Sequence, residues 1–200
     1  MKKKIWDLLV VLPFLTACSS ASKTETGYKT VEKLELSRFM GRWYVLAGRF
    51  TSFEKEVHNA VETYTWNEKK ERIDIGFTYN KGSLEGPVKS IPQKGWVYNT
   101  TTNSHWKVSP FWPLKFDYLV VGLAPDYSWT AIGVPNGDYL WIMARSPESA
   151  DQTVDQALSA LRAIGYPTQN LVRVPHGATS SSTKSTSARS SKTPKTNRTL

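Results

Sequence analysis

Apolar and polar residues alternate in short runs through the middle of the chain, and turn-forming residues separate the runs. In Ile73, Ile75, Phe77 and Tyr79 the apolar side chains occupy every second position, as on a strand that buries one face. Many short strands of this kind, spaced about 8 to 12 residues apart, favour an all-β barrel or sandwich. The pattern predicts eight strands: Arg42 to Phe50, Val57 to Trp66, Arg72 to Tyr79, Gly95 to Asn99, His105 to Phe111, Phe116 to Leu123, Trp129 to Val134 and Tyr139 to Arg145.

Eight antiparallel strands can close into a barrel wide enough for one small ligand, and closure removes exposed sheet edges. We therefore expect an eight-stranded antiparallel up-and-down β-barrel. The strongest hairpin signal is Asn136-Gly137, between the last two strands. Both residue types accept the positive φ angles that a tight turn needs.

One helix is expected after the strands. Ser149 followed three residues later by Gln152 matches a capping box, and Gly165 is a suitable C-terminal stop. Between them the apolar residues recur at helical spacing and form a single stripe: Val154, Ala157, Leu158, Leu161 and Ile164. Such a helix should pack on the outside of the barrel. A short ninth strand is expected over Asn170 to Val174.

Charge is unevenly distributed along the 200 residues. The formal net charge is +9, of which residues 1–17 carry +2 and the tail from Gly177 to Leu200 carries +5. Only +2 remains on the middle of the chain. A nucleic-acid binder usually concentrates its basic residues on the folded face, so this distribution argues against a nucleic-acid partner.

The first 30 residues predict export and lipid attachment. Three lysines precede a short apolar run, Ile5 to Ala17, which is too short to cross a bilayer and is typical of an export signal. The run ends in Leu-Thr-Ala-Cys, which resembles the lipobox of bacterial lipoproteins. The resemblance implies cleavage after Ala17, acylation of Cys18, and a polar tether over residues 18–30. The alternative is an ordinary signal peptide with an incidental cysteine.

The tail from Gly177 contains 13 Ser or Thr among its 24 residues, five basic residues and no aromatic residue. Such a composition cannot bury apolar surface, so we expect disorder over residues 177–200. Its positive charge could contact anionic envelope components, or it could simply be a solubilising extension. The folded domain is expected over residues 31–176.

Several motifs occur in the order found in one family. Gly41-Arg42-Trp43-Tyr44 resembles the Gly-x-Trp-Tyr signature of the first lipocalin strand, and the run from Tyr139 to Arg145 resembles a later lipocalin motif that ends in arginine. Together with the lipobox, the set is most similar to the bacterial outer-membrane lipocalins. The resemblance implies that Gly41, Trp43 and Arg145 close one end of the barrel, with the guanidinium stacked on the indole. It also implies an outer-membrane location in a Gram-negative bacterium.

The pocket should be lined by inward residues, one in two along each strand. Glu62 shares the parity of Tyr64 and is either an internal polar anchor or a solvent-facing residue. The open rim is expected around Thr51 to Glu56, Asn80 to Gln93 and Trp112 to Lys115. Possible partners for an anionic headgroup at the rim are Arg49, Lys55, Lys81 and Lys115. The predicted ligand-binding residues are Tyr64, Ile75, Phe77, Trp96, Trp106, Val108, Tyr118 and Trp141.

An apolar barrel with few polar groups suits a fatty acid or a lysophospholipid, which the resemblance also implies. We therefore predict a lipid-anchored carrier of a small hydrophobic ligand, which could also form a homodimer. The alternatives are a surface-interaction lipoprotein acting through its basic tail, and a lipocalin-fold enzyme acting on a lipid. Catalysis is disfavoured because no Gly-x-Ser-x-Gly motif is present. The three histidines have no metal-like spacing, and no cofactor is expected.

Overall fold

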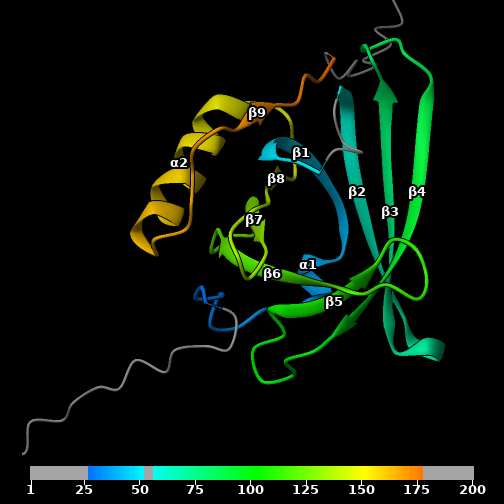
Figure 1. Cartoon of the computed structure of the whole chain (residues 1–200), viewed down its shortest axis with the longest axis vertical. Coiled ribbons are helices and arrows are strands. Elements are labelled where there is room, and N and C mark those ends of the chain that lie inside the picture. Colours follow the sequence, from blue (N-terminus) through cyan, green and yellow to red (C-terminus); the bar gives the residue numbers. More distant parts are fainter. Residues whose placement is uncertain (1–26, 52–55, 178–200) are drawn as a thin grey trace, which may run out of the picture.

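A computed structural model describes residues 27–51 and 56–177 of the chain (Figure 1). The leader, Cys18 and the tail from residue 178 lie outside the described residues, as do Lys55 and the rest of 52–55. In the described part, consecutive strands pair antiparallel from β2 through β8, and β1 pairs with both β8 and β2 and closes the barrel. The predicted eight-stranded barrel is confirmed. Its strands are β1 Gly41–Arg49, β2 Val57–Asn67, β3 Arg72–Lys81, β4 Val88–Val97, β5 His105–Ser109, β6 Phe116–Leu123, β7 Trp129–Gly133 and β8 Leu140–Ala144.

The helix α2, Ala150–Ala163, packs outside the barrel as expected (Figure 1). It buries Val154, Ala157 and Leu161 against the outer faces of β1, β6, β7 and β8. The helix stops at Gly165, whose φ of 71° is readily adopted by glycine. The predicted capping box is wrong: Ser149 is the N-cap residue, but it lies in the left-handed region and its side chain makes no capping hydrogen bond.

Two short helices were missed by the sequence pattern, since neither is long enough to show a helical repeat. The four-residue helix α1, Leu36–Phe39, precedes β1 and inserts Phe39 into one end of the barrel. A 3-10 turn, Glu68–Lys70, connects β2 to β3.

Strand β4 begins earlier than predicted. Residues Val88 to Gln93 were expected in a rim connection, but they pair with β3, with Gly76 opposite Pro92. Pro92 has no N–H to donate and normally excludes a strand interior. It is tolerated here because, in the described register, β4 pairs with β5 only from Lys94 onwards.

The β7–β8 hairpin is present, but its connection is longer than two residues. The Gly137 amide donates to the Val134 carbonyl, so Pro135 and Asn136 occupy the centre of the turn. Gly137 has a positive φ of 75°, whereas Asn136 does not. The predicted tight Asn-Gly turn is therefore wrong in its detail.

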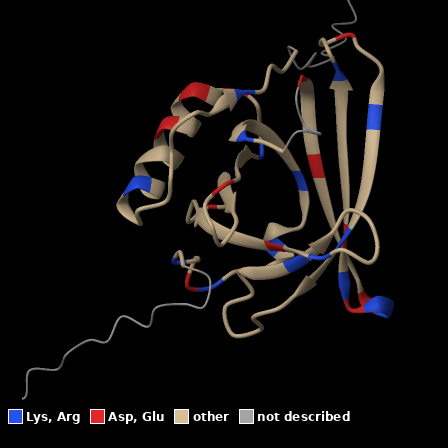
Figure 2. Cartoon of the chain, viewed as in Figure 1, with Lys and Arg blue, Asp and Glu red and all other residues tan. Residues whose placement is uncertain are grey.

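The predicted ninth strand is reduced to two residues, β9 Val172–Arg173, which pair with Ala47 and Gly48 of β1 outside the barrel's eight-strand cycle. Figure 2 shows basic and acidic positions interspersed along the described ribbon instead of gathered on one face. None of the described helices is long and apolar enough to cross a membrane.

Candidate ligand-binding barrel

One end of the barrel is sealed by Trp43 and Arg145. Trp43 is fully buried, and the Arg145 guanidinium carbon lies 3.7 Å from the centre of its ring. The Trp43 indole N–H donates to the Phe39 carbonyl at 2.8 Å, which fixes the ring against α1. The predicted stacking of Arg145 on Trp43 is therefore present. Gly41, the third residue predicted at this closed end, has a φ of 97° that favours glycine, and a Cβ there would lie 3.4 Å from the Arg145 guanidinium.

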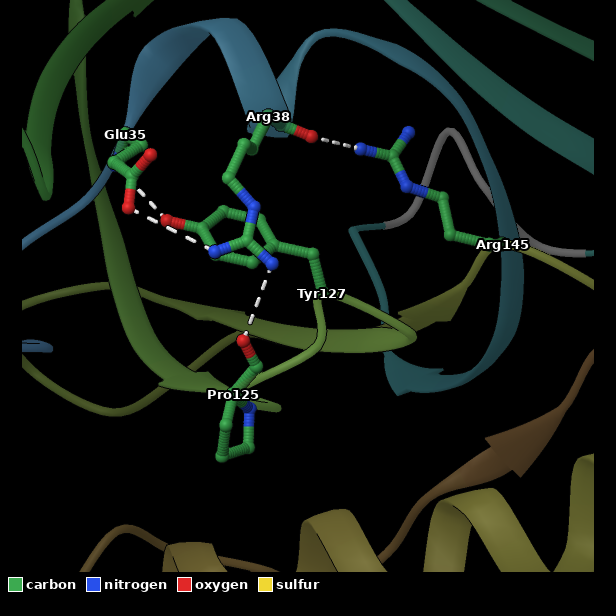
Figure 3. Close-up of polar contacts among 5 residues, drawn as sticks. All are labelled: Glu35, Arg38, Pro125, Tyr127 and Arg145. Carbon is green, nitrogen blue, oxygen red and sulfur yellow. Dashed lines mark hydrogen bonds and ion pairs between the residues drawn. The ribbon is translucent and has the colours of Figure 1, made fainter.

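Arg145 also fastens α1 to the barrel end (Figure 3). Its guanidinium donates to the carbonyls of Arg42 at 2.8 Å, Arg38 at 2.5 Å and Phe39 at 3.1 Å. Burial lowers the pKa of Arg145, because desolvation disfavours the charged form. Arg38 of α1 forms a second stacked pair, with its guanidinium carbon 4.0 Å from the Tyr127 ring centre.

An aromatic cluster fills the barrel above this seal. Phe39 contacts the rings of Trp43, Tyr64 and Trp106 at centroid distances of 5.1, 5.3 and 5.2 Å. Trp106 in turn stacks on Tyr118 at 5.3 Å with nearly parallel planes. These rings form a packed floor, so any ligand space lies between them and the opposite, open end.

Most of the predicted lining residues share the inner face. Register places Tyr64 opposite Ile75, and Trp106 opposite Tyr118, and directly opposed residues project to the same side of a sheet. The inner-face cluster includes Tyr64, Ile75, Phe77, Trp106, Val108, Tyr118 and Trp141. Whether these residues contact a ligand stays a prediction.

The predicted inward orientation of Trp96 is wrong. Its neighbours Gly95 and Val97 pair with the inner residues Ile73 and Trp106, so Trp96 projects outward. There it lies 4.3 Å from the Lys115 ammonium group. The large indole suggested burial, but strand parity decides the face and Gly95 occupies the inner position.

Three inner residues near the open end were not predicted. Phe50, Tyr79 and Ile91 are partly exposed and pack on the inner cluster. Tyr79 could have been found, because it continues the alternation of Phe77 and stacks on that ring at 5.2 Å. Ile91 lies in the part of β4 that the sequence did not predict as a strand, because Pro92 argued against one.

The inner face carries one buried carboxylate, Glu62, which is 7% exposed. The Tyr64 hydroxyl donates to it, and the Tyr64 and Tyr118 hydroxyls are hydrogen-bonded to each other. Burial and, after it, the negative charge of Glu62 hold the pKa of Tyr118 well above its usual value. Of the two alternatives for Glu62, the internal polar position is the one the structure shows.

The rim cations differ in their partners. Arg49 donates to the main-chain carbonyls of Asp138 at 2.7 Å and Gln169 at 2.8 Å, so it holds loops together. Lys115 is exposed and lies beside aromatic rings, and Lys81 is exposed. Arg49 is therefore occupied structurally, and whether Lys81 or Lys115 contacts an anionic headgroup stays a prediction.

A groove with a volume of about 540 Å³ runs over the outer wall of β2 to β5. Its lining includes Thr63, Arg72, Asp74, Lys94 and Trp112, which are mainly outward-facing and polar. The Arg72 and Asp74 side chains form an ion pair at 2.7 Å within it. The lining also includes Ile75, Pro92, Pro110 and Trp112, so the groove carries apolar as well as polar surface.

The described histidines are dispersed. His105 contacts Asp117 at 2.6 Å on the barrel wall, while His176 contacts the Val45 carbonyl on a different part of the molecule. Within residues 27–51 and 56–177, no group of three or more His, Cys, Asp or Glu side chains is placed to hold a metal ion.

A closed eight-stranded barrel, sealed at one end and lined by apolar side chains, defines the class of small ligand-binding β-barrels. The family model described as a lipocalin-like domain matches residues 34–176, so the chain belongs to the lipocalin-like family. The resemblance inferred from the motifs is confirmed. Binding of small hydrophobic ligands, not catalysis, is the general role of this family.

Relatives and solved structures agree with this assignment. The outer membrane lipoprotein Blc of Vibrio cholerae is 30% identical, covering 73% of this chain and 85% of the relative. The protein of the same name from Escherichia coli K12 is 26% identical, covering 80% and 90%. Apocrustacyanin C2 has a TM-score of 0.57 at 17% identity, covering 72% of this chain and 81% of its own. Insecticyanin of the tobacco hornworm has a TM-score of 0.57 at 14% identity, covering 76% and 85%.

Proposed function

We propose that this protein is an outer-membrane-anchored lipocalin that binds, stores or transports a fatty acid or lysophospholipid in the cell envelope. The observation that carries the proposal is the inner wall near the open end. There Phe50, Tyr79, Ile91 and Trp141 are apolar or aromatic, partly exposed and packed on the inner cluster. Apolar surface of this kind gains about 0.8 kcal/mol for each ligand methylene that it buries.

The buried carboxylate favours one orientation of the ligand. An anionic headgroup close to Glu62 would meet like charge in a medium of low dielectric constant, which is unfavourable. The acyl chain therefore enters first, and the carboxylate or phosphate stays at the rim. Lys81 is an exposed cation beside the β3–β4 connection, whereas the Lys115 ammonium group lies over the outward Trp96 ring.

The proposed location rests on residues outside the described part together with the relatives. The leader and the Leu-Thr-Ala-Cys sequence at Cys18 support lipid attachment. The relatives named outer membrane lipoprotein support the outer membrane of a Gram-negative cell.

Displacement of a fluorescent fatty acid tests the proposed site with a matched pair of variants. Trp141→Ala removes a large side chain from the inner wall, and Trp96→Ala removes the same side chain from the outer wall. We expect Trp141→Ala to weaken binding at least about tenfold, since a buried aromatic contributes well over 1.4 kcal/mol of contact. Trp96→Ala should bind as the parent does.

Native mass spectrometry of the purified protein supplies the independent measurement. A co-purified fatty acid or lysophospholipid is the expected result. If no lipid co-purifies and none displaces the probe, the carrier function is refuted. Equal loss of binding in both tryptophan variants would refute the barrel interior as the site.

A further inference from the structure

The groove on the outer wall of the barrel has the size of a small-ligand site. Its volume of about 540 Å³ lies within the range of roughly 300 to 1,000 Å³ that ligand pockets usually occupy. Two rows of side chains cross β2, β3 and β4 beneath it, and their parity is opposite to that of the inner residues Tyr64 and Phe77. Register aligns Thr65, Asp74 and Lys94 in one row, and Thr63, Gly76 and Pro92 in the other.

Gly76 leaves a hollow in the floor of this outer groove. A Cβ built on Gly76 would meet no atom within 4 Å, although Thr63 and Pro92 flank it on the neighbouring strands. Its φ is not positive, so the backbone does not require a glycine at this position. A glycine inside a strand often marks the close approach of a ligand or of another backbone. The hollow is therefore space that a ligand can fill.

The β5–β6 connection supplies an aromatic wall to the outer groove. After β5 ends at Ser109, the connection folds over the outer face of β4, where the Lys115 ammonium group lies 4.3 Å from the Trp96 ring centre. Trp112 of the same connection lines the groove and is 74% exposed, so much of its indole is open to contact. Pro110 adds apolar surface beside it.

Arg72 presents a fixed guanidinium to the outer groove. Its side chain is only 16% exposed, and its Nε donates to the Asp74 carboxylate at 2.7 Å. The second Asp74 oxygen accepts from the Asn67 amide at 2.7 Å. That bond, and after it the Arg72 and Lys70 charges, hold the pKa of Asp74 below its usual value, so the carboxylate is ionised at neutral pH.

These contacts orient Arg72 and leave part of it unused. Within the described part of the chain, the two terminal guanidinium nitrogens make no hydrogen bond to the protein. The exposed Lys94 lies opposite Asp74 in the register and also lines the groove. Two cations against one carboxylate give the described lining a positive balance. A planar guanidinium with free donors is suited to a phosphate or carboxylate group.

We propose that the outer groove binds an anionic saccharide, a sugar ring that carries a phosphate or a carboxylate. The anionic group meets the terminal nitrogens of Arg72 and the Lys94 ammonium group. An apolar C–H face of the ring lies on the Trp112 indole, and the ring occupies the hollow above Gly76. The Thr63 hydroxyl at its side can both donate to and accept from sugar hydroxyls. This site is additional to the barrel interior, and it does not depend on the proposed function.

Isothermal titration calorimetry of the purified full-length protein tests the ligand class. The probes are glucose 6-phosphate and glucuronate, which distinguish phosphate from carboxylate as the anionic group. Glucose, inorganic phosphate and adenosine monophosphate are the comparison probes. At least one anionic sugar should bind at millimolar concentrations or below, and each comparison probe should bind at least about tenfold more weakly. Absence of binding by both anionic sugars would overturn the proposal, as would equal or tighter binding of phosphate or of the nucleotide.

Two variants test the location of the site. Arg72→Gln should weaken binding of the anionic sugar at least about tenfold, because charge-assisted hydrogen bonds are lost. Its control is Arg173→Gln, which breaks the outer ion pair between Arg173 and Asp151 away from the groove. Gly76→Val should weaken binding as strongly, because its side chain fills the hollow. Its control is Thr78→Val, which places the same side chain at the next outward position of β3.

Both controls should bind the sugar as the parent does, and circular dichroism confirms that each variant is folded. Unchanged binding in folded Gly76→Val contradicts the site, and so does an equal loss in Arg173→Gln. A saturating concentration of the anionic sugar should leave a fluorescent fatty acid bound. Displacement of the fatty acid would place both ligands in one site and would overturn the outer groove as a separate one, whereas failure of the fatty acid to bind contradicts only the proposed carrier function.

Discussion

The closed end of the barrel depends on Arg145 more than on any other cation in the seal. Arg145→Ala removes the contact with Trp43, worth about 0.5 to 2 kcal/mol. It also removes three charge-assisted hydrogen bonds to carbonyls, of which those of Arg38 and Arg42 are solvent-accessible and can turn to water. The Phe39 carbonyl keeps its bond from Trp43. Together these losses predict a destabilisation of about 2 to 4 kcal/mol.

For a domain of this size, such a loss lowers the melting temperature by roughly 5 to 15 °C. Thermal unfolding followed by near-ultraviolet circular dichroism measures it. Fatty-acid affinity, measured on the folded fraction, should change much less, since the seal lies beneath the aromatic floor. The matched control is Arg38→Ala, which removes a similar stacked pair from a half-exposed site and should cost less than about 1 kcal/mol. An unchanged melting temperature in Arg145→Ala would refute the role of the seal.

Two further predictions concern Tyr166, whose hydroxyl accepts from the Val134 amide and donates to the Tyr139 carbonyl. Gly133→Ala would place a Cβ 2.4 Å from that hydroxyl, so chemical denaturation should show that the free energy of unfolding falls by about 1 to 3 kcal/mol. The control is Gly76→Ala, where a Cβ would meet open space and the free energy of unfolding should stay the same or rise. Burial raises the pKa of Tyr166 to about 12, so the folded state holds its proton more tightly than the unfolded state, where the pKa is near 10. The stability that the Tyr166 hydroxyl contributes is complete below about pH 10 and falls as pH rises towards 12. The difference in free energy of unfolding between the parent and Tyr166→Phe should therefore narrow over that range, and a constant difference contradicts this.

Strand number, the outer helix and the closure pair were predictable because each has a local signal. Alternation revealed β3, helical spacing revealed α2, and the Gly-x-Trp-Tyr motif located Trp43. The errors arose where a local signal conflicts with tertiary context. Pro92 reads as a strand breaker, yet its missing N–H faces a side of β4 that needs no partner at that point in the described register.

The face of the sheet on which a single residue lies was harder to predict, because a shift of one position moves a side chain to the opposite face. Register shifts occur between Val45 and Ala47 in β1 and between His58 and Val61 in β2. Parity counted from the sequence cannot include such bulges. Glu62 illustrates the other failure: its parity with Tyr64 was visible, but a carboxylate normally favours solvent. The Tyr64 hydroxyl, which donates to Glu62 and is hydrogen-bonded to the Tyr118 hydroxyl of β6, helps to explain its burial.

Closure of the barrel also depends on a segment that looks like the start of the tail. In the described register β1 pairs with β2 from Gly41 to Tyr44, and the open half of this seam is bridged by residues 174–177. The Val174 amide donates to the Leu46 carbonyl at 2.9 Å, and the Asn59 amide donates to the Pro175 carbonyl at 2.8 Å.

His176 also bonds to β1 at this seam between β1 and β2. Burial keeps the pKa of the His176 imidazole below its usual value, so the ring is neutral at pH 7 and its Nε2–H donates to the Val45 carbonyl at 2.8 Å. The Gly177 amide then donates to the Asn59 side chain at 2.9 Å. Main-chain groups on both strands of the seam are satisfied by this segment, so residues 174–177 belong to the closure of the barrel, and the limit of residue 176 expected from composition stays a prediction.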